Sequence, residues 1–205
     1  MKAIIKSGIF ILSCCSQQLF AQVGSIPDFR VNDNSGNIDQ REPAIATSAN
    51  GNFVVIWEDQ RNGGKEIFAQ IFGSNGQRHG TNFRVNQASG TPSDPDIGVA
   101  ANGNFVVIWT RSNNIYGRLF DSAGNGLSGD LKMNDNTDGS KQVDNAVAMS
   151  SAGKFVAVWQ DSRNGNNDIY ASLRNSNGST VGNNIKVNGD TGSSNQLDPG
   201  VAIDD

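Results

Sequence analysis

All three tryptophans of this 205-residue chain lie in one repeated frame. The frame reads Phe-Val-Val-Ile-Trp at residues 53–57 and 105–109, and Phe-Val-Ala-Val-Trp at 155–159. A longer unit that contains it begins near residues 29, 83, 131 and 185, so successive units start 54, 48 and 54 residues apart. A period near fifty indicates supersecondary units that stack, because one such unit cannot bury its own apolar face. The sequence therefore predicts a repeat architecture.

Each unit has the pattern of four short strands. In the first complete unit we expect strands at 43–47, 52–58, 66–72 and 82–86, separated by turn residues. The frame at 53–57 places apolar side chains on both faces of its strand, which suits the inner part of a propeller blade better than a sandwich. We predict an all-β fold, a β-propeller-like array of four-stranded antiparallel blades, with three complete repeats and partial ones at each end. The tryptophans are expected in the core.

The repeats differ in length at only two places. One is the connection between successive blades, and the other is the loop between the second and third strands. In an up-and-down blade these two connections open on the same side. One face of the array should therefore consist of fixed short turns and the other of longer, variable loops, where binding sites are commonly placed.

The first 21 residues have the features of a secretory signal peptide, with a basic start, an apolar run and a cleavage site after Ala21. The alternative is a lipobox at Cys14, which would anchor the protein to a membrane through lipid. Residues 22–205 are then the partial β-propeller. Cys14 and Cys15 are the only cysteines, so we expect a secreted or cell-surface domain without disulfides and without a transmembrane segment.

Charge and repeat number limit the partners. Removing Lys2 and Lys6 with the leader changes the formal net charge from -4 to -6, which argues against nucleic acid. Closed propellers usually have four to eight blades. Three complete repeats therefore predict either a fragment of a longer chain or closure as a homo-oligomer. We expect no cofactor.

Two segments carry a family resemblance. Residues 159–171 and 120–127 resemble repeats of exported bacterial β-propeller proteins, and they are distantly similar to sialidase-type propellers. Sialidase-type blades have a Ser-x-Asp-x-Gly-x-x-Trp turn. The turns at 74–76, 122–124 and 176–178 share its Ser and Gly but lack the central Asp and the final Trp. The sialidase arginine triad and nucleophilic tyrosine have no counterpart here, so the resemblance implies the fold and not the activity.

A polar loop after the second strand recurs at 58–66 and 160–168, and a single arginine remains in the middle repeat. A ring of Asp and Arg side chains on the loop face could hydrogen-bond a polyol or glycan. Alternatively, each Asp caps its own turn and pairs with Arg. The second interpretation is favoured, because a unique ligand site seldom repeats in every blade. The predicted ligand-binding residues are Asp59, Arg61, Glu66, Arg111, Asp161, Arg163 and Asp168.

Other chemistry is weakly indicated. Residues 134–139 resemble a calcium loop but lack its leading Asp and its bidentate Glu, so an ordinary turn is favoured and no metal site is predicted. The one histidine, His79, is expected in a short turn, which nearly excludes Ser-His-Asp chemistry. Hydrolysis by two converging carboxylates stays open. Acidic residues gather in the connections between blades at Asp33, Asp39, Asp94, Asp96, Asp135, Asp138 and Asp144.

From these patterns we predict a non-catalytic extracellular or cell-surface module that recognises glycan or protein partners. One alternative is the propeller fragment of a glycan-cleaving hydrolase. The other is a structural repeat segment of a surface adhesin. The fold alone decides nothing among the three.

Overall fold

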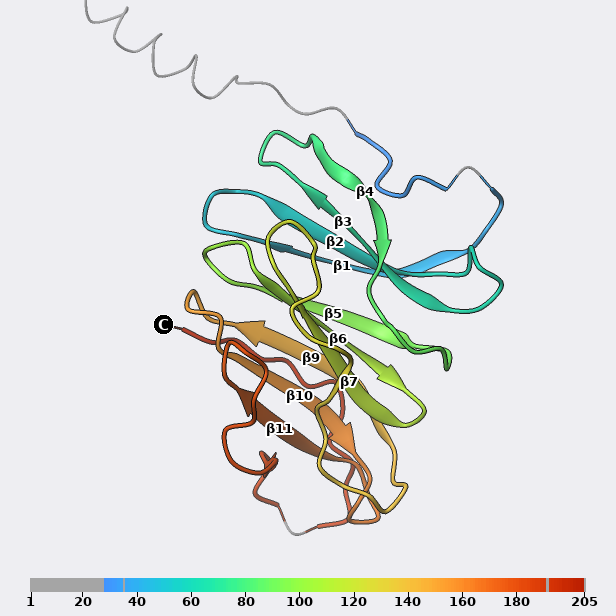
Figure 1. The fold of residues 1–205 in the computed structure, drawn as a ribbon. Helices are drawn as coiled ribbons and strands as arrows, with labels where there is room; N and C mark the ends of the chain where they lie inside the picture. Colours follow the sequence, from blue (N-terminus) through green and yellow to red (C-terminus); the bar gives the residue numbers. More distant parts are fainter. Residues whose placement is uncertain (1–27, 35, 191, 205) are drawn as a thin grey trace, which may run out of the picture. The chain divides into compact units, whose positions relative to one another are not determined.

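The computed structural model describes residues 28–34, 36–190 and 192–204. The predicted leader, residues 1–21, lies outside this part of the chain. The chain divides into a short N-terminal unit, of which residues 28–30 are described and contain no strand, and a unit from Val31 onward that holds all the strands. This larger unit consists of three four-stranded antiparallel sheets (Figure 1). The predicted all-β blade array is thereby confirmed.

Each sheet is a meander of four consecutive strands, called here blades 1, 2 and 3. Blade 1 contains β1 (Gln40–Thr47), β2 (Phe53–Asp59), β3 (Glu66–Phe72) and β4 (Arg78–Arg84). Blade 2 contains β5 (Ser93–Val99), β6 (Phe105–Arg111), β7 (Asn114–Phe120) and β8 (Leu131–Lys132). Blade 3 contains β9 (Gln142–Met149), β10 (Phe155–Asp161), β11 (Asp168–Arg174) and β12 (Ile185–Lys186).

The first strands of adjacent blades contact one another, β1 with β5 and β5 with β9. We call them the inner strands. Each leads into the second strand through a short turn whose glycine has positive φ, 81° at Gly51, 85° at Gly103 and 84° at Gly153. The residue before each glycine does not have positive φ. The turn is therefore a type I turn followed by a left-handed glycine.

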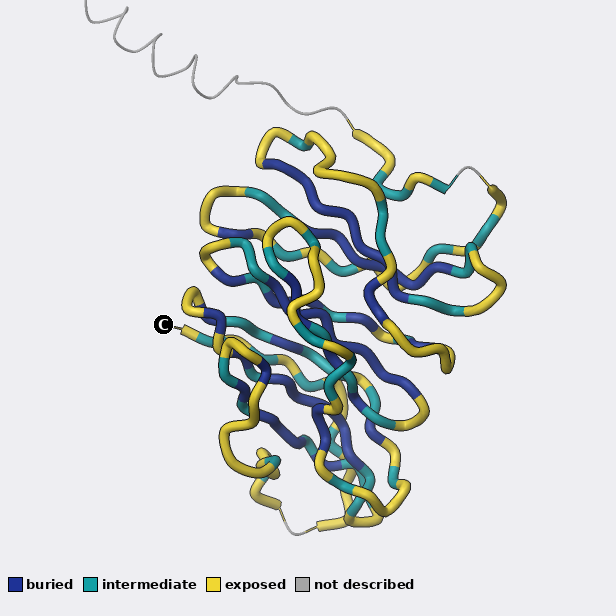
Figure 2. Tube along the Cα trace, viewed as in Figure 1, coloured by how far each residue is buried: buried dark blue, intermediate teal, exposed yellow. Residues whose placement is uncertain are grey.

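The blades are joined by their apolar faces. The second strands β2, β6 and β10 are buried along most of their length on both faces, as the dark segments of Figure 2 show. Trp109 and Trp159 have no exposed surface and Trp57 is 3% exposed, which confirms that the tryptophans belong to the core.

Each blade has an aliphatic face and an aromatic face, and stacking joins unlike faces. The aliphatic face of blade 1 packs on the aromatic face of blade 2. The aliphatic face of blade 2 packs in the same way on the aromatic face of blade 3. The aliphatic faces are represented by Val54, Ile56 and Ile67 in blade 1 and by Val106, Ile108 and Ile115 in blade 2. The aromatic faces are represented by Phe105, Trp109 and Tyr116 in blade 2 and by Phe155, Trp159 and Tyr170 in blade 3.

One sequence prediction about local structure is wrong. His79 lies in strand β4, paired with Ile71, and not in a turn. The partial repeats at the two ends, at 28–32 and 199–203, contain no strand in the structure as described, because neither segment has a neighbouring strand of its own blade to pair with. Among the described residues, none forms a helix of the length and apolarity needed to cross a membrane.

Candidate functional site

Every inner strand has a β-bulge opposite a tryptophan. In β1 the register shifts between Arg41 and Ala44, so two residues oppose Trp57. The same shift occurs in β5 opposite Trp109 and in β9 opposite Trp159. A bulge leaves its extra residue unpaired and changes the direction of a side chain, and bulges are common beside active sites.

The first residue of each bulge is acidic and has a left-handed backbone conformation. The φ angles are 48° at Glu42, 53° at Asp94 and 50° at Asp144. Asp198, at the same position of the fourth partial repeat, has a φ of 51°. Holding a non-glycine residue in this region costs about 1–3 kcal/mol, although Asp tolerates it better than most residues. An acidic residue held in this conformation at four equivalent positions is the most distinctive feature of the loop face.

Two of these acids, Asp94 and Asp198, act electrostatically on a third, Asp144. Burial raises the pKa of Asp144, and the nearby negative charges of Asp94 and Asp198 raise it further. Lys141 and a hydrogen bond from Gln160 oppose this shift in part. Carboxyl groups that share a site disfavour one another's ionisation, and such groups are typical of acid–base chemistry. We call Glu42, Asp94, Asp144 and Asp198 the bulge acids.

A further carboxyl lies immediately after the bulge of β5. Asp96 occurs where blades 1 and 3 have Ala44 and Ala146, so it does not follow the repeat. Burial raises its pKa, against hydrogen bonds from the backbone N–H groups of Val147 and Ile97. The Val147 nitrogen lies 2.7 Å from Asp96 Oδ2, which links inner strand β5 to inner strand β9.

Polar contacts from neighbouring strands hold the bulge of β5 in place. The backbone N–H of Asp94 donates to Glu58 Oε1 at 3.1 Å, across the interface of blades 1 and 2. Glu58 also pairs with Lys65 at 2.8 Å. On the other side, the Asn145 amide donates to the Asp94 carbonyl oxygen at 3.0 Å. The conformation of this bulge is therefore set by residues of all three blades.

The residues that the sequence predicted to bind a ligand form separate groups, one in each blade. In blade 1, Asp59 is buried and accepts hydrogen bonds from Trp57 Nε1 at 2.8 Å and from Arg61 Nη2 at 2.7 Å. Burial alone would raise the pKa of Asp59, but the hydrogen bonds from Arg61 and Trp57 hold it below its usual value. Arg61 also stacks over the Phe68 ring at 4.2 Å and pairs with Asp33 at 2.7 Å.

Blade 3 repeats this group closely. Asp161 accepts from Trp159 Nε1 at 2.9 Å and from Arg163 Nη2 at 2.7 Å. Arg163 stacks over Tyr170 at 4.1 Å and pairs with Asp135 at 2.9 Å. The Asp and Arg side chains of blades 1 and 3 are thus paired with other residues of the protein. This agrees with the interpretation in which each Asp caps its own turn and pairs with Arg.

The remaining predicted residues are also paired. Arg111 in blade 2 stacks over Tyr116 at 3.8 Å and pairs with Asp130 at 2.7 Å. Glu66 pairs with Arg84 and Asp168 pairs with Lys186, each at 2.9 Å. The binding of a ligand by these seven residues stays a prediction.

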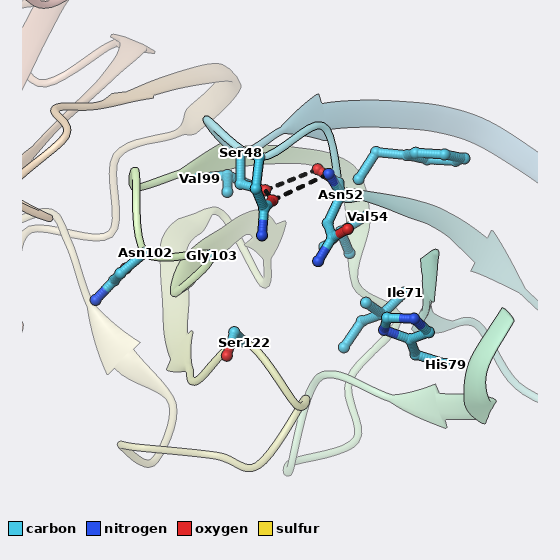
Figure 3. A pocket seen from close by; sticks show the side chains of 11 residues that line it. Ser48, Asn52, Val54, Ile71, His79, Val99, Asn102, Gly103 and Ser122 are labelled. Atoms are coloured by element: carbon cyan, nitrogen blue, oxygen red, sulfur yellow. Dashed lines mark hydrogen bonds between the residues drawn. The ribbon is translucent and has the colours of Figure 1, made fainter. Parts of the chain in front are cut away.

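A small cavity of about 190 Å³ lies on the short-turn face between blades 1 and 2 (Figure 3). It is lined by turn residues such as Ser48 and Asn102, and His79 points toward it from β4. A comparable cavity lies between blades 2 and 3, where Leu127 takes the position of His79. Because the cavity recurs without the histidine, it follows from blade packing and is not a candidate site.

The loop at 134–139 is held by its own side chains. Asp138 Oδ1 accepts hydrogen bonds from the Ser140 backbone and hydroxyl and from Asn136. The Ser140 and Asn136 hydrogen bonds lower the pKa of Asp138 to about 2. Among the residues that the structure describes, no group of three or more His, Cys, Asp or Glu side chains is arranged to hold a metal ion.

Asp94, Asp96 and Asp144 are among the acids expected between blades, but the sequence alone did not place them in a site. Glu42 and Asp198 were not among the residues predicted from the sequence. A usable signal was present, because the residue before Pro43, Pro95, Asn145 and Pro199 is acidic in every repeat.

No protein-family model and no curated protein sequence matches this chain. Three solved structures share its fold. They are an endo-arabinase from Bacteroides thetaiotaomicron (TM-score 0.52, 13% identity, covering 80% of this chain and 67% of that one), an N-acetylgalactosamine deacetylase from F. plautii in complex with blood group B trisaccharide (0.51, 11%, 81% and 56%), and Zg3597, a family 117 glycoside hydrolase from Zobellia galactanivorans (0.50, 13%, 78% and 59%). This chain therefore spans between 56% and 67% of the length of these structures.

The comparisons change two expectations. At 11–13% identity they show a propeller-type fold, and none of the three named structures is a sialidase, so the finer sialidase-type assignment is not supported. The prediction of a non-catalytic recognition module is wrong, because the three structures that share the fold are named as carbohydrate-active enzymes.

Proposed function

We propose that this chain is part of a glycan-cleaving propeller hydrolase whose reacting groups are the bulge acids. The observation that carries the proposal is the acidic residue held with a left-handed backbone at the bulge of each neighbouring inner strand. In agreement with it, burial and the charges of Asp94 and Asp198 raise the pKa of Asp144. The site lies at the beginning of the inner strands, on the side of the array where the connections between blades open.

Glycoside hydrolysis needs two carboxyl groups in different protonation states. One group, with a raised pKa, protonates the leaving oxygen, and an ionised partner activates water or attacks the sugar. In the proposal Asp144 is the proton donor and Asp94 is the partner carboxyl group. The negative charge of Asp198 adds to the rise in the pKa of Asp144.

The remaining polar side chains of the loop face have a supporting role in this proposal. The Arg61 and Arg163 groups stiffen the loops that surround the acids, because each arginine joins an aromatic ring to two carboxylates. Their partly exposed partners Asp33 and Asp135 are available to hydrogen-bond sugar hydroxyls, since their side chains are 39% and 44% exposed. The names of the similar structures support a carbohydrate substrate.

Export is part of the same proposal, since polysaccharides are met outside the cell. The basic start and apolar run of residues 1–21 motivate it. The intact mass of protein recovered from the medium of an exporting host tests it. A mass that begins at Gln22 supports export and cleavage, and a product retained in the cell with its leader contradicts them.

The test of function is a set of extracellular polysaccharides, including arabinans, incubated with the full chain. Mass spectrometry of the soluble fraction detects released oligosaccharides, and a pull-down with the insoluble polysaccharides measures binding separately. Release that is lost in both Asp94→Asn and Asp144→Asn supports the proposal. Binding without release by the wild-type chain contradicts it.

A further inference from the structure

The residue after each bulge acid is proline in three repeats and asparagine in one. Proline stands at positions 43, 95 and 199, whereas blade 3 has Asn145. The backbone before this residue is nevertheless alike in all four repeats, since φ is 50° at Asp144 and lies between 48° and 53° at the other three bulge acids. The bulge conformation therefore does not require asparagine, and the reason for Asn145 has to lie in its side chain.

The Asn145 side chain joins two inner strands. Its amide nitrogen donates to the Asp94 carbonyl oxygen at 3.0 Å and to Thr110 Oγ1 at 3.3 Å, and proline could make neither bond. Strands β5 and β9 belong to different sheets, so no backbone ladder fixes the distance between them. The Asn145 amide therefore couples the bulge that carries Asp94 to the bulge that carries Asp144.

The other junction between inner strands lacks such bonds. Asp96, which also departs from the repeat, accepts the Val147 N–H and so joins β5 to β9 a second time. At the junction of β1 and β5 the corresponding residues are Ala44 and Pro95, whose side chains have no hydrogen-bonding group. Both pairs of strands pack on each other, so the stacking of blades does not depend on these bonds.

Asparagine at position 145 also has an energetic disadvantage. Asn145 Oδ1 is buried and has no hydrogen-bond partner among the described residues. A buried acceptor without a donor destabilises the folded state. Proline at this position would leave no such atom. A departure from the repeat that lowers stability is expected at a functional site more than in a scaffold.

We propose that Asn145 is a positioning residue that sets the distance between the carboxyl groups of Asp94 and Asp144. The inference rests on the proposed function, in which these two groups react. In glycoside hydrolysis the distance between the two carboxyl groups decides whether the second one attacks the sugar or activates water. Without the Asn145 bridge the two bulges should move apart, because like charges repel each other.

Replacement by the residue of the other repeats tests the proposal. Asn145→Pro removes the amide, and Asn145→Leu does the same without restricting the backbone, in case proline is not accommodated. Both variants should lose about a hundredfold in kcat at unchanged KM, because the reacting groups are displaced while the sugar contacts remain.

The matched control is Arg118→Leu. It removes another side-chain hydrogen bond between blades, from Arg118 Nη1 to the Val85 carbonyl oxygen at 2.8 Å. Arg118 does not belong to the bulges, so this variant should unfold at a lower temperature and keep the kcat of wild type. Thermal unfolding of all three variants shows that each is folded.

Titration of Asp144 gives a readout that needs no substrate. Its pKa is raised by burial and by two negative charges, and one positive charge and one hydrogen bond oppose this; the groups are Asp94, Asp198, Lys141 and Gln160. With Asp94 further away, the pKa of Asp144 should fall toward its ordinary value in both Asn145 variants and stay unchanged in Arg118→Leu. Carboxyl carbon NMR across a pH series measures it.

The titration separates this proposal from the proposed function. An unchanged Asp144 pKa in folded Asn145→Leu overturns the positioning role whatever the activity, and so does an Arg118→Leu chain that shows the same shift. A wild-type chain that releases no sugar contradicts the proposed function, and the titration then decides alone whether Asn145 positions the two acids.

Discussion

Arg111 and Asp130 form in blade 2, at 2.7 Å, the ion pair that Arg163 and Asp135 form in blade 3. The acid of this pair occupies one position in blade 2 and another in blades 1 and 3, and a neutral residue occupies the remaining position in each case. In blades 1 and 3 the acid, Asp33 or Asp135, precedes the first strand of its blade. Two hydrogen bonds join it to Asn82 or Asn184, each from the backbone N–H of one residue to a side-chain oxygen of the other. In blade 2 the positions hold Gln87 and Asp130, and Asp130 accepts the backbone N–H of Gln87.

This exchange predicts a rescue. Asp130→Asn leaves Arg111 buried without a carboxylate and should lower the free energy of unfolding by about 2–3 kcal/mol. Adding Gln87→Asp should recover most of the loss, because it gives blade 2 the Asp and Asn order of its neighbours. Urea unfolding of the two variants measures both effects. Asp39→Asn, which removes the exposed pair with Arg41, is the control and should cost less than about 1 kcal/mol. A double variant no more stable than Asp130→Asn would contradict the assignment.

The tryptophans should not be equivalent in energy. Trp159 Nε1 donates to Asp161, whereas Trp109 Nε1 has no hydrogen-bond partner among the described residues, because Arg111 stands where blade 3 has Asp161. Trp159→Phe should therefore destabilise the protein by about 1–2 kcal/mol more than Trp109→Phe. Denaturant unfolding monitored by circular dichroism gives both values. Equal losses would mean that the Trp159 hydrogen bond contributes nothing.

The buried carboxyl of Asp96 predicts a pH dependence. Burial raises its folded pKa above the ordinary 3.8, so its favourable contribution is complete below that pH and is lost as the pH rises through the folded pKa. Asp96→Asn keeps an oxygen for the Val147 N–H and should become more stable relative to wild type between pH 3.5 and 7. Asp138→Asn should behave oppositely, because the pKa of Asp138 is lowered to about 2. The free energies of unfolding of Asp96→Asn and wild type, measured across this range, would refute the argument if their difference did not change with pH.

Much of the fold could be predicted from the repeat. The period, the apolar frames and the turn glycines gave three blades, and the third strand at 66–72 agrees with β3. Even Arg111 was correctly matched to Arg61 and Arg163, although it stands two positions earlier relative to its tryptophan. Its side chain nevertheless stacks on the equivalent aromatic ring.

The bulge acids recur visibly in the sequence, but their place in a bulge could not be predicted in the same way. A bulge is a feature of hydrogen-bond register, and the residue types at 42–43 do not show that two residues oppose Trp57. The effect of Asp198 on Asp144 crosses from one repeat to the next, so it depends on how blades stack. The Asp and Arg loops are the more visible repeat in the sequence, and the structure shows that their side chains pair with one another.

The most direct measurement is kcat/KM for release of reducing ends from the best polysaccharide, for the wild-type chain, Asp144→Asn and Asp138→Asn. Both variants remove one carboxylate from the same stretch of chain, but only Asp144 belongs to the bulge acids. The account predicts that Asp144→Asn loses at least about a hundredfold, the lower range for a general acid, while Asp138→Asn stays within about twofold of wild type. Equal activity of Asp144→Asn and wild type, with both folded, would contradict it.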